Sequence, residues 1–264
     1  MKYYKDIILK TTKDAKLGHF HMWTPESIKQ FWEVWHTIPS LRPLHPRYFY
    51  EDLIRNTKEY LRDIGTAIDV GCGSGIVLEI LVKQRIGQQL VGIDMSERSL
   101  ESMASGRFKS YTQLSFILGN IVELPLEAES CDLVICTEVF EHLFPDDYVS
   151  GLNEISRILK PQGYLLGTTP LNEKMIVAIC PECHTIFHPH QHLLFEIDPD
   201  WLKQELNRFK LEIIKFVHPI EPSIPRTWWK RILKHRIIIP FFPTLAMRLF
   251  PTSGVSGFLA RKIR

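Results

Sequence analysis

The residue types with the clearest chemistry form a glycine-rich turn, Asp69-Val70-Gly71-Cys72-Gly73-Ser74-Gly75. Glycine permits positive φ angles in a tight turn and lets the backbone approach a ligand closely, and the following helix start offers unpaired N–H donors. Asp94 ends the next apolar run, where its carboxylate can accept both hydroxyls of a ribose. The third glycine lies one residue earlier than in the dinucleotide pattern, and no basic side chain occupies the turn. These features predict a nucleoside ligand without a pyrophosphate.

Glu138, Glu141 and His142 form a second group that could carry chemistry. Their spacing of i, i+3 and i+4 would place all three side chains on one face of a helix. Two carboxylates and an imidazole can hold a divalent cation, which would lower the pKa of hydroxyls on an acceptor. In the alternative interpretation, Glu141 and His142 cap a helix start and shape a pocket without a metal.

A third group runs from Cys180 to His192 and reads CPECHTIFHPHQH. Cys180 and Cys183 can hold two thiolates at one edge of a tetrahedron, and His188 with His192 has a spacing common among zinc ligands. Four such ligands would close the coordination shell, so the pattern predicts a structural zinc that fixes this loop. Free cysteines in a turn, with histidines that serve the substrate, are the other interpretation. The alternative ligands are His184 and His190.

The elements that must position these groups alternate between short apolar runs and helical stretches. The expected strands are residues 66–70, 90–94, 115–118, 131–136, 164–168, 211–217 and 257–262. The expected helices are residues 76–83, 152–159 and 199–209, with a helix stop and turn at residues 160–163. This alternation predicts an α/β fold with a doubly wound, mainly parallel sheet. Ligands bind beyond the carboxyl ends of the strands in such sheets.

Residues 1–60 are expected to form a helical extension, which acts either as a lid over a pocket or as a packing face. Thr24 is the expected N-cap of a helix that begins with Pro25, because the missing N–H of proline costs nothing there. The remaining residues, 61–264, are expected to form one domain. That domain would include the zinc loop at 178–195 and a basic amphipathic insertion at 222–252.

The composition conceals an uneven distribution of charge. The 264 residues are 45% hydrophobic and 23% charged with a net charge of +2, which excludes collagenous, disordered and coiled-coil proteins. Nine basic residues and no acidic ones follow Glu221, and the other 23 basic residues face 30 acidic ones, which leaves residues 1–221 with a charge of −7. Trp228 and Trp229 lie among these cations. We therefore expect residues 226–248 to bind an anionic membrane surface. The alternatives are that this segment binds nucleic acid or forms a solvated basic face without a partner.

The five cysteines are an odd number in unlike positions, and the sequence shows no secretory signal pattern. We therefore expect a cytoplasmic protein. The apolar stretch between Arg236 and Arg248 is broken by two prolines and is shorter than the roughly 20 residues that span a bilayer. Attachment would accordingly be peripheral, at the inner face of the membrane.

The glycine-rich turn and the segments after it resemble the class I S-adenosylmethionine-dependent methyltransferases. The resemblance covers residues 66 to about 217. The matching segments in chain order are Asp69 to Gly75, Gly92-Ile93-Asp94, Gly119-Asn120-Ile121 with Leu124-Pro125, Glu138 to Leu143, and Ile158 to Tyr164. Asn120 stands where the family more often has Asp, which keeps an acceptor for the adenine amino group but removes the charge.

This resemblance implies S-adenosylmethionine as cofactor and assigns residues to its parts. Gly71 and Gly73 would line the methionine portion, and Asp94 would bind the ribose. Asp69 would orient the turn and reach the cofactor amino group directly or through water. The remaining expected cofactor-binding residues are Cys72, Met95 (packed on the adenine), Asn120 and Ile121 (closing the adenine site), and Glu138. Glu141 and His142 are the candidate catalytic residues nearest the point of methyl transfer, with His192 behind them.

Two further resemblances bear on the acceptor. The Cys-Pro-x-Cys insertion with its histidines resembles bacterial methyltransferases associated with glycan or lipid-linked saccharide assembly. The sequence therefore predicts O-methylation of a glycan, lipid-linked or related small-molecule acceptor. The Glu-x-x-Glu-His pattern also resembles metal-binding motifs of ubiquinone-pathway O-methyltransferases and of small-RNA 2′-O-methyltransferases. A metal-dependent RNA 2′-O-methyltransferase is the first alternative, and a non-catalytic module that binds the cofactor is the second.

Overall fold

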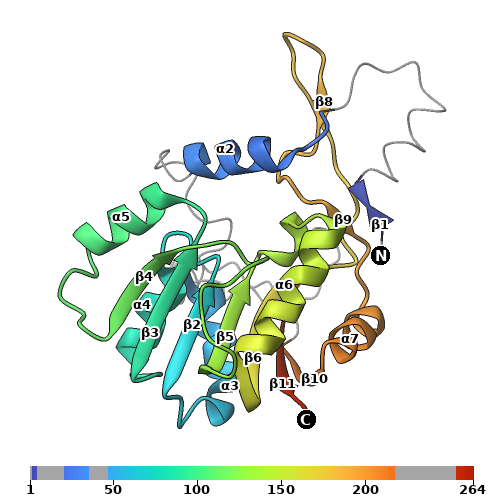
Figure 1. Ribbon diagram of the computed structural model, residues 1–264. Helices are drawn as coiled ribbons and strands as arrows, with labels where there is room; N and C mark the ends of the chain where they lie inside the picture. Colours follow the sequence, from blue (N-terminus) through green and yellow to red (C-terminus); the bar gives the residue numbers. More distant parts are fainter. Residues whose placement is uncertain (1, 5–20, 36–46, 218–253) are drawn as a thin grey trace, which may run out of the picture.

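A seven-stranded sheet forms the centre of the computed structural model, which describes residues 2–4, 21–35, 47–217 and 254–264. The strands are β2 (Thr66–Val70), β3 (Gln89–Asp94), β4 (Leu114–Leu118), β5 (Cys131–Thr137), β6 (Leu159–Leu171), β10 (Leu211–Val217) and β11 (Gly254–Lys262). Their spatial order is β10-β11-β6-β5-β2-β3-β4. The strand β11 pairs antiparallel with both β10 and β6, and the other pairs in this sheet are parallel. This order, with its reversal beside β2, confirms the predicted doubly wound sheet (Figure 1).

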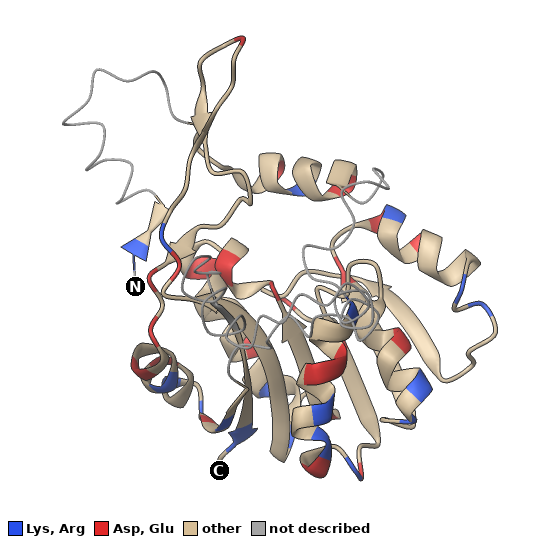
Figure 2. Ribbon diagram, turned by 180° about the vertical axis from the view of Figure 1, so that it is seen from behind, with Lys and Arg blue, Asp and Glu red and all other residues tan. Residues whose placement is uncertain are grey.

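Helices cover both faces of the sheet, as the opposite views in Figure 1 and Figure 2 show, and alternate residues of the central strands pack against them. The helices are α3 (Arg47–Thr57), α4 (Ile76–Gln84), α5 (Glu97–Ser105), α6 (Pro145–Ile158) and α7 (Pro199–Arg208), with the short 3-10 helices η2 (Lys58–Tyr60) and η3 (Phe140–His142). In β5, Val134 shares a buried cluster with residues of α6 and α7, whereas Leu133 shares the opposite cluster with residues of α3, α4 and α5. Because successive strand side chains point to opposite faces, one strand contributes to both cores.

The helix α2 (Pro25–Trp35) lies at the carboxyl edge of the sheet, where Ile28 and Trp32 line a cavity together with the ends of β2 and β3. It begins at the predicted proline, and the Thr24 hydroxyl accepts a hydrogen bond from the backbone N–H of Ser27 at 3.2 Å. The predicted cap is therefore confirmed. Figure 1 shows α2 above the strands.

The segment after β6 forms small antiparallel pairs instead of joining the sheet. The strands β7 (Ala178–Ile179) and β8 (Ile186–Phe187) form a hairpin that projects from the body (Figure 1). The strand β9 (Leu194–Phe195) then pairs with β1 (Lys2–Tyr3). The pairing is extended by a hydrogen bond from Tyr4 N to Leu193 O at 2.8 Å and by an ion pair between Lys2 and Glu196 at 2.7 Å.

Two predicted boundaries were wrong. The helix expected at 152–159 begins seven residues earlier, at Pro145. The strand β6 begins at Leu159 and runs through residues 160–163, where a helix stop and turn were expected. Proline suits the first helical turn, and Asp146 and Asp147 favourably meet the positive end of the helix dipole. None of the described helices is long and apolar enough to cross a membrane. The basic segment 226–248 falls among residues 218–253, outside the described part of the chain.

Candidate functional site

The glycine-rich turn follows β2 and has the left-handed backbone that its composition predicted. Gly71, Gly73 and Gly75 have φ angles of 73°, 50° and 72°. A Cβ atom on Gly71 would lie 2.5 Å from the Val139 side chain, so both backbone strain and lack of space exclude larger residues. The N–H groups of Gly71 and Cys72 donate to Ile93 O at 2.8 and 3.0 Å. These bonds join the turn to the end of β3.

Asp94, at the end of β3, holds the same turn from its other side. Its Oδ2 accepts a hydrogen bond from Gly73 N at 2.7 Å, and its Oδ1 accepts one from Ser96 N at 2.9 Å. A carboxylate oxygen can accept more than one hydrogen bond, so each oxygen keeps acceptor capacity for a ligand. Asp94 therefore sets the conformation of the turn and also presents acceptors to the cavity that it lines.

Asp69, on β2, is a buried carboxylate whose two oxygens have no partner among the described residues. Burial, and secondarily the negative charge of Asp94, raises the pKa of Asp69 to about 8. Buried polar atoms are seldom left without hydrogen bonds in native proteins. A cationic or N–H-bearing group of a ligand would satisfy these oxygens and restore the charged form of the carboxylate.

One cavity brings most of the predicted cofactor-binding residues together. Its lining includes Gly71, Gly73, Asp94, Met95, Asn120, Ile121 and Glu138. Asp69 and Cys72 lie beside this lining and do not contribute to it. The candidate catalytic residue His142 lines the cavity, whereas Glu141 does not. Sequence reasoning did not assign Ile28, Trp32, Val139 and Leu143, which give the cavity apolar walls.

Glu138 does not share a helix face with Glu141 and His142, so that prediction was wrong. Glu138 has a φ of 55° and precedes η3, a single 3-10 turn. Its side-chain Oε1 accepts a hydrogen bond from the Thr168 hydroxyl at 2.7 Å, and its own N–H donates to that hydroxyl oxygen at 3.1 Å. The left-handed residue turns the chain out of β5, which directs Glu138 towards β6 and away from the expected cation site.

Glu141 and His142 instead meet His192, which comes from the loop before β9. The ligand-type atoms of these three buried residues lie within 4.8 Å of one another. His142 Nδ1 lies 3.2 Å from Gln191 O, and His192 Nδ1 lies 2.6 Å from Glu173 Oε2. Each Nδ1 faces an acceptor and therefore carries the proton, which leaves a lone pair on each Nε2. Both Nε2 atoms and Glu141 Oε1 lack hydrogen-bond partners among the described residues.

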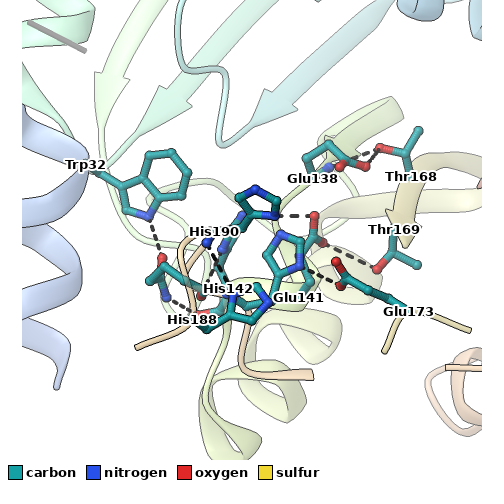
Figure 3. A network of polar contacts seen from close by, with 11 residues as sticks. Trp32, Glu138, Glu141, His142, Thr168, Thr169, Glu173, His188 and His190 are labelled. Atoms are coloured by element: carbon teal, nitrogen blue, oxygen red, sulfur yellow. Dashed lines mark hydrogen bonds and ion pairs between the residues drawn. The ribbon is translucent and has the colours of Figure 1, made fainter. Parts of the chain in front are cut away.

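Burial dominates the protonation of this cluster. Desolvation, followed by the charge on His192, lowers the pKa of His142 well below its usual value. Desolvation, followed by the charge on Glu138, raises the pKa of Glu141. The environment thus favours a neutral imidazole at the edge of the cavity. Figure 3 shows the cluster, in which Glu173 lies beside the histidines and Trp32 lies at the opposite side.

The four predicted zinc ligands do not form one cluster: among the described residues, the groups close enough to share a metal ion include His192 but neither cysteine nor His188. Cys180 and Cys183 lie in the turn between β7 and β8 at the tip of the projecting hairpin (Figure 1), whereas His188 and His192 are buried. Cys183 Sγ donates to the Thr185 hydroxyl at 3.1 Å, and hydrogen bonding from Thr185 lowers the pKa of this thiol to about 7.

His188 is also oriented unsuitably for a metal. Its Nδ1 lies 3.2 Å from His190 N and 3.4 Å from His192 N, and both are N–H donors. The proton of the neutral ring must therefore lie on Nε2, which leaves that atom without a lone pair. Of the alternative ligands, His184 lies at the hairpin tip, and His190 groups with Glu173 and His192.

The fold, the glycine-rich turn and the carboxylate after β3 define a class I methyltransferase fold. Residues 68–167 match the family model described as "Methyltransferase domain". Over these residues the chain is therefore similar to a methyltransferase domain.

Curated relatives include the ubiquinone biosynthesis O-methyltransferase of Nitrosomonas europaea, 26% identical over 81% of this chain and 77% of that protein. The Vibrio campbellii protein of the same name is 30% identical, but the match covers only 57% of this chain and 64% of that protein.

Solved structures show the same fold at low sequence identity. A methyltransferase in complex with the Haloferax volcanii Trm112 activator superimposes with a TM-score of 0.62 and 16% identity, over 90% of this chain and 98% of that one. The 1,6-didemethyltoxoflavin-N1-methyltransferase of Burkholderia thailandensis, solved with S-adenosylhomocysteine, gives a TM-score of 0.63 and 14% identity over 94% of both chains.

Proposed function

We propose that the protein transfers the methyl group of S-adenosylmethionine to a hydroxyl group of a small-molecule acceptor. The observation that carries this proposal is the cavity at the carboxyl edge of the sheet. Asp94, the glycine-rich turn and His142 all contribute to the lining of this cavity. A nucleoside cofactor and a proton-accepting side chain would thus share one cavity.

The cofactor would bind along the turn, with Asp94 accepting the ribose hydroxyls. The buried carboxylate of Asp69 would pair with the α-amino group of the methionine portion, directly or through water, because its two oxygens otherwise lack partners. Met95, Asn120 and Ile121 line the cavity further along and would enclose the adenine. Gly71 and Gly73 would allow the backbone to approach the methionine portion.

The acceptor side supports transfer to oxygen. In the reaction, the bond between the methyl carbon and the sulfonium sulfur breaks while a carbon–oxygen bond forms, and S-adenosylhomocysteine leaves as a neutral thioether. The acceptor hydroxyl must lose its proton, and the free lone pair on His142 Nε2 can accept it. His192, held by Glu173 at 2.6 Å, offers a second lone pair behind His142. The relatives named as O-methyltransferases also favour oxygen.

The same three side chains fit a divalent cation. Glu141, His142 and His192 offer one carboxylate and two imidazole nitrogens, a donor set that suits zinc, manganese or iron better than magnesium. Hydrogen bonds to Glu173 and to Gln191 O orient the two rings in the manner of metal ligands. A cation held there would occupy the His142 Nε2 lone pair and would lower the pKa of the acceptor hydroxyl, so His142 would then act as a ligand and not as the base. We therefore include this metal as a proposed second cofactor.

The acceptor that we propose is a glycan, a lipid-linked intermediate or a related small molecule. The apolar side chains Ile28, Val139 and Leu143 in the cavity wall suit an acceptor with an apolar portion. The basic segment 226–248 would bring the protein to an anionic membrane surface. Its support comes from the sequence, in which nine cations and no carboxylate follow Glu221. Liposome co-sedimentation with and without anionic lipid tests this part.

Methyl-labelled S-adenosylmethionine tests the reaction directly. The protein would be incubated with separated lipid, saccharide and RNA fractions, with and without EDTA. We expect base-stable label in the lipid or saccharide fraction, as methyl ethers require. Label only in RNA would replace the proposed acceptor by an RNA 2′-hydroxyl. Calorimetric binding of S-adenosylhomocysteine without label transfer to any fraction would favour a non-catalytic binding module. Activity unaffected by EDTA would exclude the proposed cation.

A further inference from the structure

A single residue, Gln191, connects the helix α2 with His142. Trp32 Nε1–H, from α2, donates to Gln191 Oε1 at 3.0 Å. The backbone carbonyl of Gln191 lies 3.2 Å from His142 Nδ1, and its side-chain Nε2 lies 3.5 Å from His142 O. Gln191 is fully buried and has a φ of 59°. From this one position, Gln191 therefore contacts His142 through its backbone carbonyl and Trp32 through its side-chain oxygen.

This arrangement fixes which nitrogen of His142 carries the proton. A carbonyl oxygen only accepts hydrogen bonds, so Nδ1 must be the N–H nitrogen of the neutral ring. The free lone pair then lies on Nε2, at 4.0 Å from Glu141 Oε1. The opposite tautomer would place two acceptors, Nδ1 and Gln191 O, against each other. Loss of the Gln191 carbonyl from this position would remove that preference.

Trp32 also fixes the plane of the imidazole. The Trp32 and His142 rings meet edge to face, with centroids 4.9 Å apart and an interplanar angle of 81°. Trp32 and His142, the two residues that Gln191 connects, both line the cavity. An acceptor bound there would therefore contact both of them. Figure 3 shows the Trp32 indole directed towards the loop that carries the histidines.

We propose that Trp32 and Gln191 are positioning residues that hold His142 in the Nδ1–H tautomer with Nε2 available to the cavity. The position of α2 then determines whether His142 is ready to act on an acceptor hydroxyl. The catalytic role of this tautomer rests on the proposed function. The tautomer itself is a property of the protein without any acceptor.

Long-range ¹H–¹⁵N NMR of the histidine side chains tests the proposal on the full chain. The signal of His142 is assigned from its loss in His142→Gln. We expect one Nδ1–H tautomer in the wild type. In Trp32→Phe, which keeps a ring against His142 but removes the indole N–H, the tautomer ratio should change roughly three- to tenfold, the range that one neutral hydrogen bond supports. Gln191→Met, which keeps the backbone and side-chain length, should change it in the same direction.

Trp35→Phe is the matched control, because Trp35 lies on the same helix and packs against Phe31 and Trp32. It should leave the ratio unchanged. A wild-type His142 protonated on Nε2, or equal ratios in Trp32→Phe and Trp35→Phe, would overturn the proposal. Calorimetry with S-adenosylhomocysteine on the same samples reports folding and the cofactor site. Absent cofactor binding with the expected tautomer change would contradict the proposed function while leaving the positioning role intact.

Discussion

The proposed cofactor side and the proposed acceptor side of the cavity are built in different ways. On the cofactor side, Asp94 already bonds the N–H of Gly73, and the turn is joined to β3 before any ligand arrives. On the acceptor side, His142 and His192 come from segments 50 residues apart, and several of their buried polar atoms lack partners among the described residues. The first region is formed by segments close to one another in the sequence. The second depends on the long segment after β6, which α2 contacts through the hydrogen bond from Trp32 to Gln191.

The largest expected effect comes from Asp94→Ala, which alters the proposed cofactor side. The substitution removes the acceptor of the Gly73 N–H and the proposed acceptors of the ribose hydroxyls. Two hydrogen bonds to a charged group, each about 1.5 kcal/mol or more, correspond to at least roughly 100-fold weaker cofactor binding. Calorimetry with S-adenosylhomocysteine measures it, with the exposed Asp146→Asn as control. Unchanged affinity would refute the assignment of this carboxylate.

The pH dependence of cofactor affinity tests the role of Asp69 on the proposed cofactor side. The pKa of Asp69 in the free protein is about 8, so the carboxyl is mostly protonated at pH 7 and must ionise to pair with an ammonium group. S-Adenosylmethionine affinity should therefore fall by about tenfold per unit as the pH is lowered below 8, with proton release on binding. Calorimetry in buffers of different ionisation enthalpy measures both quantities. In Asp69→Asn the slope should disappear, and a slope that persists would assign it to another group.

Glu173→Gln tests the acceptor side alone. It removes the charge that orients His192 but leaves the glycine-rich turn untouched. Partners of this kind typically contribute 10- to 100-fold, so methyl transfer should fall about tenfold or more while cofactor affinity stays the same. The measurement pairs initial rates on the labelled acceptor fraction with calorimetry. His184→Gln, at the exposed hairpin tip, is the control. A parallel loss of cofactor affinity would show that the two sides are not separable.

The smallest effect is expected from Cys180→Ser combined with Cys183→Ser. The two thiols lie at the hairpin tip, away from the buried histidines, so the melting temperature should shift by less than about 2 °C and activity should persist. Differential scanning fluorimetry and elemental analysis measure the outcome. A loss of one zinc per chain together with a drop of many degrees would restore the four-ligand site that the structure separates.

The sequence predicts the cofactor side well because its determinants are local. The bounds of β2 and β10 agree with the expected ones, and the glycine pattern anticipates the φ angles of Gly71, Gly73 and Gly75. A strand, a turn and a helix that follow one another leave few possible arrangements, and parallel strands bring Asp94 to the same edge.

The acceptor side could not be predicted to the same extent. Regular spacing suggested a helix at Glu138, but a left-handed residue at that position redirects the chain. Nothing in the spacing of Cys180, Cys183, His188 and His192 shows that a two-stranded hairpin carries the thiols away from the imidazoles. The contact of His192 with Glu141 depends on the path of the loop, which is set by tertiary contacts such as that between Trp32 and Gln191.

The pairing of β1 with β9 has a consequence for the order in which the two sides can form. Residues 2–4 are synthesised before β2, β3 and the glycine-rich turn, whereas their partners at residues 193–195 are synthesised after all of these. The strands that hold the cofactor side can pair as soon as residues up to β5 are available, whereas the loop with His192 must wait for a contact of very large sequence separation. The ability to bind cofactor would thus mature during synthesis before the ability to use it.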